Sequence, residues 1–225
     1  MKDVEDWGMD KLSELKVVAE KIKSCSRCEL SRERKFIYPG VGSPDSKVIF
    51  IGTAPGPSCD RILSLSTAHP FIEGARTPFY EGTDTGKILN SWFDFMGLNR
   101  DDFYLTNLVK CPVKRESPPF DPTPKQIENC SLWLEREIVI IQPKLIVTLG
   151  FSAKKHLLGA GIQCNYGECK EIHKCYGGKN MMIKFFPLPH PMNVQGYSLR
   201  PCEISNEVRN MLTELKRLVK EIETA

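Results

Sequence analysis

The sequence lacks a long, uninterrupted apolar run. The longest apolar stretch, from Ile138 to Leu149, is broken by Gln142, Pro143 and Lys144 and is too short to cross a bilayer. The first ten residues are acidic and lack the apolar core that a secretory signal peptide requires. We therefore expect a protein that needs no membrane and that acts inside the cell, in the cytoplasm.

A strong charge of either sign is also lacking. Lys and Arg number 31 against 28 Asp and Glu, so the net charge is only +3, which by itself does not indicate a nucleic-acid partner. The 225 residues contain no internal repeat and no low-complexity tract, and 41% hydrophobic content is ordinary for a globular protein. We expect a monomer with one domain that spans residues 1–225.

Short apolar runs alternate with segments whose apolar residues recur at helical spacing. This alternation predicts an α/β fold, a three-layer α/β/α sandwich around a central, mainly parallel four-stranded sheet. A helical extension of about residues 1–35 precedes the sheet. Because loops after the carboxyl ends of parallel strands form binding sites, we expect the chemistry there. The predicted strands are 47–52, 102–109, 144–150 and 181–187.

Nine cysteines stand out in a chain of this composition, and their odd number excludes a complete set of disulfides. In a reducing compartment, cysteines more often bind metal or act in catalysis. Cys25 and Cys28 have C-x2-C spacing, and Cys111 and Cys130 follow in the middle of the chain. Four thiolates suit zinc or an iron–sulfur cluster, and spacing alone does not choose between the two.

A second possible metal group consists of three cysteines and a histidine, which would suit zinc. It lies in a Gly-rich segment between the third and fourth predicted strands, where we expect a surface excursion. Cys59 and Cys202 have no assigned role. The second group is Cys164, Cys169, His173 and Cys175.

Several short motifs, taken in order, resemble the uracil-DNA glycosylase superfamily, and most closely its iron–sulfur-containing family 4. No single match is specific, but the ordered set is, and it covers the chain from about Cys25 to Pro191. The motifs are Cys25-Ser-Arg-Cys28, Tyr38–Gly42 with Lys47–Gly56, Thr77-Pro-Phe79 with Gly82 and Gly86, Tyr104–Cys111, Cys130, Gln142–Gly150 and His190-Pro191.

The resemblance implies a monofunctional DNA glycosylase that flips uracil, or a related deaminated base, out of DNA and hydrolyses its N-glycosidic bond. The partner would be DNA that contains a damaged base. A [4Fe–4S] cluster would be held by Cys25, Cys28, Cys111 and Cys130.

An extruded base needs a pocket with an aromatic face and a polar group that matches the base edge. The motifs assign stacking to Phe79, with Phe71 as a competitor because the preceding loop is long. Asn107 can both donate and accept at a pyrimidine edge, and His190 can donate to the oxygen that gains negative charge. The backbone around the pocket would come from Gly52, Ala54, Pro55 and Gly56.

The chain departs from the family pattern at Thr53, where family 4 normally has an acidic residue. A carboxylate can orient water and stabilise a developing sugar cation, whereas a threonine hydroxyl carries no charge. We count Thr53 among the candidate catalytic residues. The alternative is a catalytically altered member that binds nucleic acid or acts on a different base; a zinc protein unrelated to DNA is a third possibility.

Basic residues near the cysteines are candidates for phosphate contacts, which supply sequence-independent affinity. Lys110, Lys114 and Arg115 cluster around Cys111. Met192, next to His190, is a candidate wedge for the gap left by a flipped base.

Overall fold

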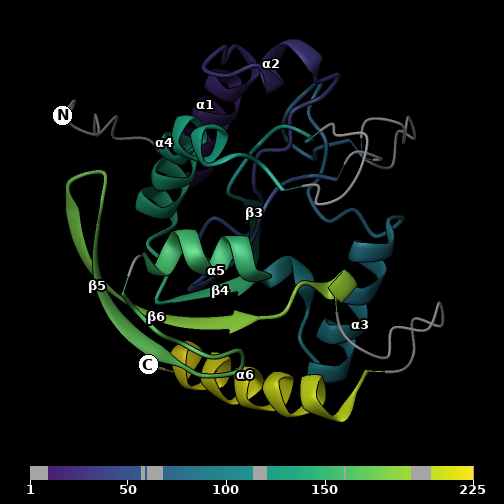
Figure 1. Cartoon of the computed structure of the whole chain (residues 1–225), viewed down its shortest axis with the longest axis vertical. Coiled ribbons are helices and arrows are strands. Elements are labelled where there is room, and N and C mark those ends of the chain that lie inside the picture. The colour runs from purple at the N-terminus through teal and green to yellow at the C-terminus, as the bar shows by residue number, and fades with distance from the viewer. Residues whose placement is uncertain are drawn as a thin grey trace.

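The computed structural model describes residues 10–56, 59, 68–113, 121–159, 161–193 and 204–224. Figure 1 shows a twisted sheet with helices on both faces. The predicted N-terminal helix is α1 (Lys11–Lys23), which Asp10 caps by accepting a hydrogen bond from the Ser13 N–H. The first part of the predicted helical extension, residues 1–9, lies outside the described part of the chain.

The sheet has six strands in the order β1-β3-β2-β4-β6-β5. The four central strands are parallel to one another, which confirms the predicted parallel core. The strands are β1 (Val41–Gly42), β2 (Val48–Gly52), β3 (Tyr104–Asn107), β4 (Leu145–Leu149), β5 (Lys170–Tyr176) and β6 (Lys179–Leu188).

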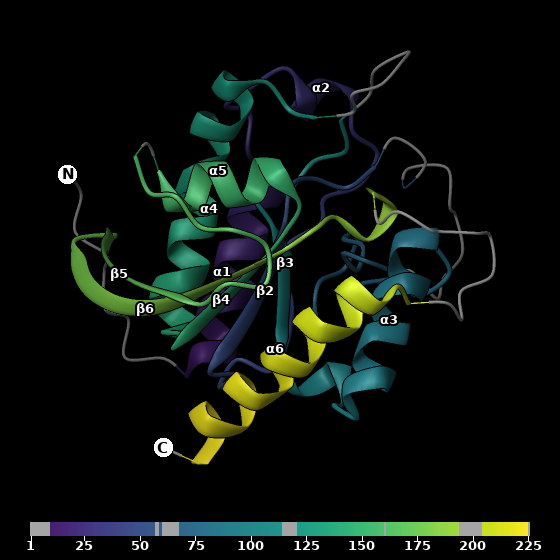
Figure 2. The ribbon, with the colours of Figure 1, turned by 60° about the horizontal axis from the view of Figure 1, so that its bottom comes forward.

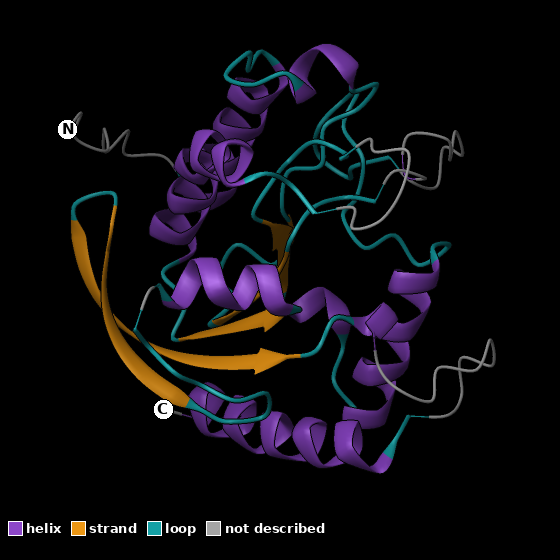
Figure 3. Cartoon of the chain, in the orientation of Figure 1, coloured by secondary structure: helices purple, strands orange, loops and turns teal. Residues whose placement is uncertain are grey.

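The prediction of a four-stranded sheet is wrong, because an antiparallel strand is added at each edge. β1 pairs with β3 over only two residues, which is too short to show a sequence pattern. β5 pairs with β6 and buries mainly Ile172 and Tyr176 along its length, so it has no continuous apolar run. Figure 3 shows β5 and β6 as a long, curved hairpin at the edge of the sheet.

Helices cover both faces of the sheet and create two apolar cores. Alternate residues of β2 enter opposite cores, as expected for a buried strand: Ile49 and Ile51 on one face, Val48 and Phe50 on the other. α1, α4 and α5 contribute to the first core, and α3 and α6 to the second. Figure 2 shows α6 crossing the second face in front of the sheet. The remaining helices are α2 (Leu30–Glu33), α3 (Asp84–Met96), η3 (Arg100–Asp102), α4 (Pro124–Ile141), α5 (Phe151–Leu158), η4 (Pro191–Asn193) and α6 (Asn206–Thr224).

The start of α4 is stabilised by a capping box that Thr123 and Gln126 form. The Thr123 hydroxyl accepts a hydrogen bond from the Gln126 N–H, and the Gln126 side chain accepts one from the Thr123 N–H. This capping box satisfies main-chain donors at the helix start. Among the described helices, none is both long enough and apolar enough to span a membrane.

The carboxyl ends of the parallel strands meet at one edge of the sheet. Gly52, the last residue of β2, pairs in register with Asn107, the last residue of β3. Leu149 at the end of β4 pairs with Leu188 at the end of β6. The loops after these strands are therefore brought together, as the sequence predicts.

Candidate functional site

Gly52, Phe79 and Asn107 meet where β2 and β3 end. A Cβ atom built on Gly52 would lie 2.5 Å from Cζ of the Phe79 ring and 2.6 Å from Oδ1 of Asn107. No side chain larger than that of glycine fits between the ring and the amide. The structure thus brings together three of the residues that the sequence assigns to the base pocket.

Asn107 is 2% exposed, and its Oδ1 atom has no hydrogen-bond partner among the described residues. A buried amide oxygen without a partner costs about 1–3 kcal/mol, so such atoms are rare in folded proteins. Its position beside the Phe79 ring makes it an acceptor that is ready for a ligand donor. The main chain of the same residue is held in place, because the Lys110 ammonium donates to its carbonyl oxygen at 2.7 Å.

Phe79 reaches this group through an unusual backbone conformation, with φ at +53°. Phe71, the competing aromatic residue, is 48% exposed, and its ring lies near Lys16 of α1 and near His69. The structure therefore brings Phe79, and not Phe71, against Gly52. The expectation that Phe71 competes for the stacking position is wrong, because its exposed ring lies near Lys16 of α1 instead.

His190 follows β6 and lies against Gly150, the residue after β4. A Cβ atom on Gly150 would be 3.0 Å from Cβ of His190, and Gly150 has a φ of +96°. The Nδ1 atom of His190 accepts a hydrogen bond from the Met192 N–H at 3.2 Å. Burial lowers the pKa of His190, and the charge of Asp121 opposes this only in part. The ring is therefore neutral near pH 7, with its proton on Nε2, where it can donate to a ligand.

The loop that begins at Thr53 is hydrogen-bonded to the segment that runs from Asn107 to Val113 and includes Cys111. The Thr53 carbonyl accepts from the Val109 N–H at 3.0 Å, and the Pro55 carbonyl accepts from the Val113 N–H at 3.3 Å. Ala54 packs against the core formed with α1 and α4, and space around Gly56 is open. The loop is thus anchored beside Asn107 by its main chain.

Cys25, Cys28, Cys111 and Cys130 line one small cavity between α1, α2, α4 and the loop after β3. The Arg34 guanidinium donates to Cys111 Sγ at 3.1 Å, and the Lys110 N–H donates to Cys130 Sγ at 3.4 Å. Burial raises the pKa of Cys130 to about 12, so this thiol stays protonated unless a cation binds it. Four thiols in one cavity, two of them with N–H donors aimed at their sulfurs, match the surroundings of a cysteine-bound metal centre.

The second cysteine group does not form a metal site in the described part of the chain. Among the described His, Cys, Asp and Glu side chains, no three converge on a point where they would hold one metal ion, and this holds for the four cavity cysteines as well as for the second group. Cys164 is buried and donates to the Glu168 carbonyl at 3.4 Å, whereas Cys175 is exposed. The zinc alternative for this group therefore has no support.

Lys110 does not point toward DNA, and its assignment as a phosphate contact is wrong. Its side chain is fully buried, and its ammonium lies 2.6 Å from the Glu137 carboxylate of α4. It also donates to the Thr106 hydroxyl at 2.5 Å. A lysine in a loop after a strand is usually exposed. Lys110 is buried because its ammonium pairs with Glu137, which follows 27 residues later in the chain. Lys114 and Arg115 lie outside the described residues.

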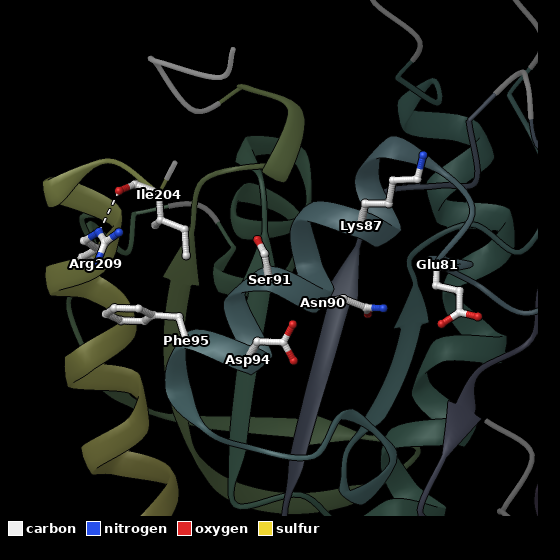
Figure 4. A pocket seen from close by; sticks show the side chains of 8 residues that line it. All are labelled: Glu81, Lys87, Asn90, Ser91, Asp94, Phe95, Ile204 and Arg209. Atoms are coloured by element: carbon white, nitrogen blue, oxygen red, sulfur yellow. Dashed lines mark hydrogen bonds between the residues drawn. The ribbon is translucent and has the colours of Figure 1, made fainter. Parts of the chain in front are cut away.

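A separate open pocket of about 710 Å³ lies along α3 near the start of α6. Figure 4 shows side chains of both charges around it, with Arg209 donating to the Ile204 carbonyl. None of the pocket residues belongs to the base-pocket group. Its lining consists of Glu81, Lys87, Asn90, Ser91, Asp94, Phe95, Ile204 and Arg209.

Comparison with known proteins places this arrangement in a family. Residues 39–216 match the family model described as "Uracil DNA glycosylase superfamily". The type-4 uracil-DNA glycosylase of Sulfurisphaera tokodaii is 32% identical over 191 residues, 81% of this chain and 75% of that protein. The type-4 enzyme of Thermotoga maritima is 30% identical over 203 residues, 89% of this chain and 90% of that protein.

A type-5 uracil-DNA glycosylase of Thermus thermophilus is also similar, at 28% identity over 164 residues, which cover 67% of this chain and 63% of that protein. The family match includes Gly52 and Asn107 at the ends of β2 and β3, His190 after β6, and Cys111 and Cys130. The chain belongs to the uracil-DNA glycosylase superfamily.

Proposed function

We propose that this protein is a monofunctional DNA glycosylase that hydrolyses the bond between uracil and deoxyribose in DNA. The observation that carries the proposal is the buried, unpaired Oδ1 of Asn107 beside the Phe79 ring. Uracil offers a donor at N3 and an acceptor at O4, and an asparagine amide matches both. The three relatives compared above are named uracil-DNA glycosylases, which agrees with this assignment.

In the proposed reaction, the uracil nucleotide leaves the base stack and its ring lies on Phe79. Gly52 leaves room for the close approach, and Asn107 holds the base edge. As the bond from C1′ to N1 breaks, the electron pair moves to the base, and the Nε2–H of His190 donates to its O2. The oxygen of a water molecule bonds to C1′ and releases one proton to the solvent, and the uracil anion takes up one proton from the solvent, so the products are free uracil and an abasic site.

The test is incubation with single-stranded and duplex oligonucleotides that contain one uracil, followed by alkali to cut abasic sites. We expect cleavage at the uracil position and none at thymine or cytosine. No product with uracil, hypoxanthine or xanthine would overturn the enzyme assignment. DNA binding without cleavage would instead support the catalytically altered, nucleic-acid-binding alternative that Thr53 favours.

Replacing Thr53 with aspartate is expected to raise kcat by about tenfold or more, since carboxylate acid–base roles contribute about 10²–10⁴-fold. The carboxylate would orient the attacking water and stabilise positive charge on the sugar, while KM changes little. Thr53→Asn is the matched control, because it has the same shape without the charge. Equal rates for Thr53→Asp and the parent protein would show that position 53 does not act on the water.

DNA contacts would come from the protein surface around the base pocket. Met192 is 40% exposed and follows His190 and Pro191 directly, so it remains our candidate for the wedge that fills the vacated base position. Lys114 and Arg115 remain candidates for phosphate contacts. We propose that the protein binds DNA as a monomer.

The four cysteines of the cavity fit a [4Fe–4S] cluster, which we propose they hold. Cys25 and Cys28 lie between α1 and α2, Cys130 lies in α4, and Cys111 follows β3. When bound, the cluster supplies covalent links between these segments rather than a step in base removal. Arg34 and the Lys110 main chain would donate hydrogen bonds to its sulfur ligands.

Replacing Cys111 with alanine is expected to remove most of the iron and the broad absorption near 400 nm, and to lower Tm by about 10 °C or more. Metal binding contributes to folding when the ligands come from distant segments. Iron analysis, absorption spectra and thermal unfolding measure these effects. Cys164→Ala, which alters a buried thiol outside the cavity, should keep the iron; full iron content in Cys111→Ala would contradict the ligand assignment.

A further inference from the structure

Phe79 has a strained backbone that needs an explanation. Among the described non-glycine residues, only Phe79 and Gln142 have a positive φ. Gln142 caps the end of α4, where a left-handed residue is common. Phe79 lies in a loop, and its φ of +53° is disfavoured for a residue with a Cβ, by about 1 kcal/mol or more. Contacts around it must therefore hold this conformation.

Arg100 of η3 supplies those contacts. Its Nη2 atom donates to the Phe79 carbonyl at 2.7 Å and to the Pro78 carbonyl at 3.3 Å. Its Nη1 atom donates to Oδ1 of Asn90 in α3 at 2.6 Å. A guanidinium is a rigid, planar set of donors, so these bonds fix the direction of the Phe79 carbonyl. Figure 4 shows the Asn90 side chain on α3, pointing away from Phe95 and Arg209.

The first turn of α3 closes the other side of the same loop. A Cβ atom on Gly86 would lie 1.9 Å from the Tyr80 carbonyl oxygen and 2.7 Å from the Phe79 carbonyl oxygen. The Thr83 hydroxyl donates to the Tyr80 carbonyl at 2.7 Å. The main chain at Phe79 and Tyr80 is thus held between α3 and η3, and the Phe79 ring lies against Gly52.

Arg100 is a mostly buried cation without a role in the proposed chemistry. Burial lowers its pKa, and the nearby charges of Asp101 and Glu81 oppose this shift. Its hydrogen bonds go to two main-chain carbonyls and an amide, not to the base-pocket atoms themselves. Burying a charge costs free energy. We therefore assign Arg100 to positioning the Phe79 loop rather than only to stabilising the fold.

We propose that Arg100, oriented by Asn90, is the positioning residue that holds Phe79 in its left-handed conformation and so places the stacking ring beside Asn107. This inference rests on the proposed function, because it assigns Phe79 to the face of an extruded base. Arg100 does not touch the base and acts only through Phe79.

A double-mutant cycle in the full-length protein tests this proposal. Arg100→Met keeps an unbranched side chain as far as the position of Nε and removes all the donors; we expect kcat/KM on uracil-containing DNA to fall about 30-fold, mainly through kcat. Phe79→Ala is expected to cost about 100-fold, and the double variant about 100-fold rather than the product of the two. If the double variant lost activity by the product of the two single losses, the proposal would be overturned. Arg100→Met would then act independently of Phe79, as it would if it only lowered the folded fraction of the protein.

Two further variants separate positioning from general damage. Arg100→Lys keeps one donor within reach of the Phe79 carbonyl and should recover part of the loss. Arg209→Met removes a cation from the neighbouring surface pocket and should leave kcat/KM unchanged within about twofold, as distant surface changes usually do.

A crystal structure of Arg100→Met provides a readout that does not depend on activity, so the proposal can fail separately from the proposed function. We expect Phe79 to leave the positive-φ region and its ring to move away from Gly52. Retention of φ near +53° in that variant would overturn the proposal, whatever the uracil assay shows for the parent protein.

Discussion

Asn107→Ala is expected to abolish base excision, with kcat lowered by about a thousandfold or more. The Asn107 amide is buried beside the Phe79 ring, and its acceptor oxygen has no partner among the described residues. A site that hydrogen-bonds a substrate edge discriminates by about 10⁴–10⁵, because its polar groups stay unpaired with the wrong ligand. Single-turnover assays with uracil-containing oligonucleotides measure the loss without interference from product release.

Thermal unfolding of Asn107→Ala separates a loss of catalysis from a loss of folding. Because Oδ1 is unpaired in the free protein, its removal eliminates a buried polar atom as well as some packing. We expect Tm to change by about 3 °C or less, in contrast to the loss of activity. Asn107→Asp is the matched control, since it keeps the shape but faces the departing uracil anion with a negative charge. A rate equal to that of the parent protein in Asn107→Ala would show that the pocket assignment is wrong.

The central part of the fold was predictable because four strands are buried on both faces. β2, β3 and β4 consist of buried residues, and the last four residues of β6 are buried too, so these sequences are apolar apart from Thr106, Asn107 and Thr148. The two edge strands, β1 and β5, are not buried along their whole length and so have no such apolar run. β5 alternates between buried and exposed residues, and its pairing with β6 depends on a hairpin at Gly177 and Gly178, which both have positive φ.

The candidate site was predictable where the residues end parallel strands. Gly52 and Asn107 were expected at the same edge, and the register of β2 and β3 brings them side by side. The positioning of Phe79 by Arg100 was not expected, because a hydrogen bond to a main-chain carbonyl leaves no pattern in the sequence. Such contacts depend on the packing of η3 against a loop that precedes it by about 20 residues.

Lys110 illustrates the same limit with a charged side chain. Its neighbours along the chain suggested a basic DNA-binding loop, but the ammonium turns inward to Glu137 on α4. The only trace in the sequence is an acid at the start of the apolar run 137–141. The carboxylate of Glu137 accepts from Lys110, from the Thr106 hydroxyl at 2.8 Å and from the Gly40 N–H at 2.9 Å. These donors come from two segments of the chain, Gly40 before β2 and the stretch 106–110 at the end of β3.

Lys110→Met is therefore expected to lower the free energy of unfolding by about 3–5 kcal/mol, the usual cost of leaving one member of a buried ion pair alone. Glu137 is 1% exposed and cannot recover its hydration without opening the core. The double variant Lys110→Met/Glu137→Gln should recover most of this loss, because it removes both charges and keeps a side-chain oxygen as an acceptor for the Gly40 N–H or the Thr106 hydroxyl. Urea unfolding of the two variants and the parent protein measures the difference.

The same variants distinguish the buried pair from a DNA contact. If Lys110 bound a phosphate, Lys110→Met would weaken DNA binding and reduce its salt dependence by about one counterion, with little change in stability. The structure predicts the opposite order of effects: a large loss of stability, and a salt dependence of binding that is unchanged in the stable double variant. Because the Lys110 ammonium also holds the Asn107 carbonyl, the double variant should still excise uracil more slowly than the parent protein. Full activity in that variant would show that the ion pair stabilises the fold without positioning the base-binding amide.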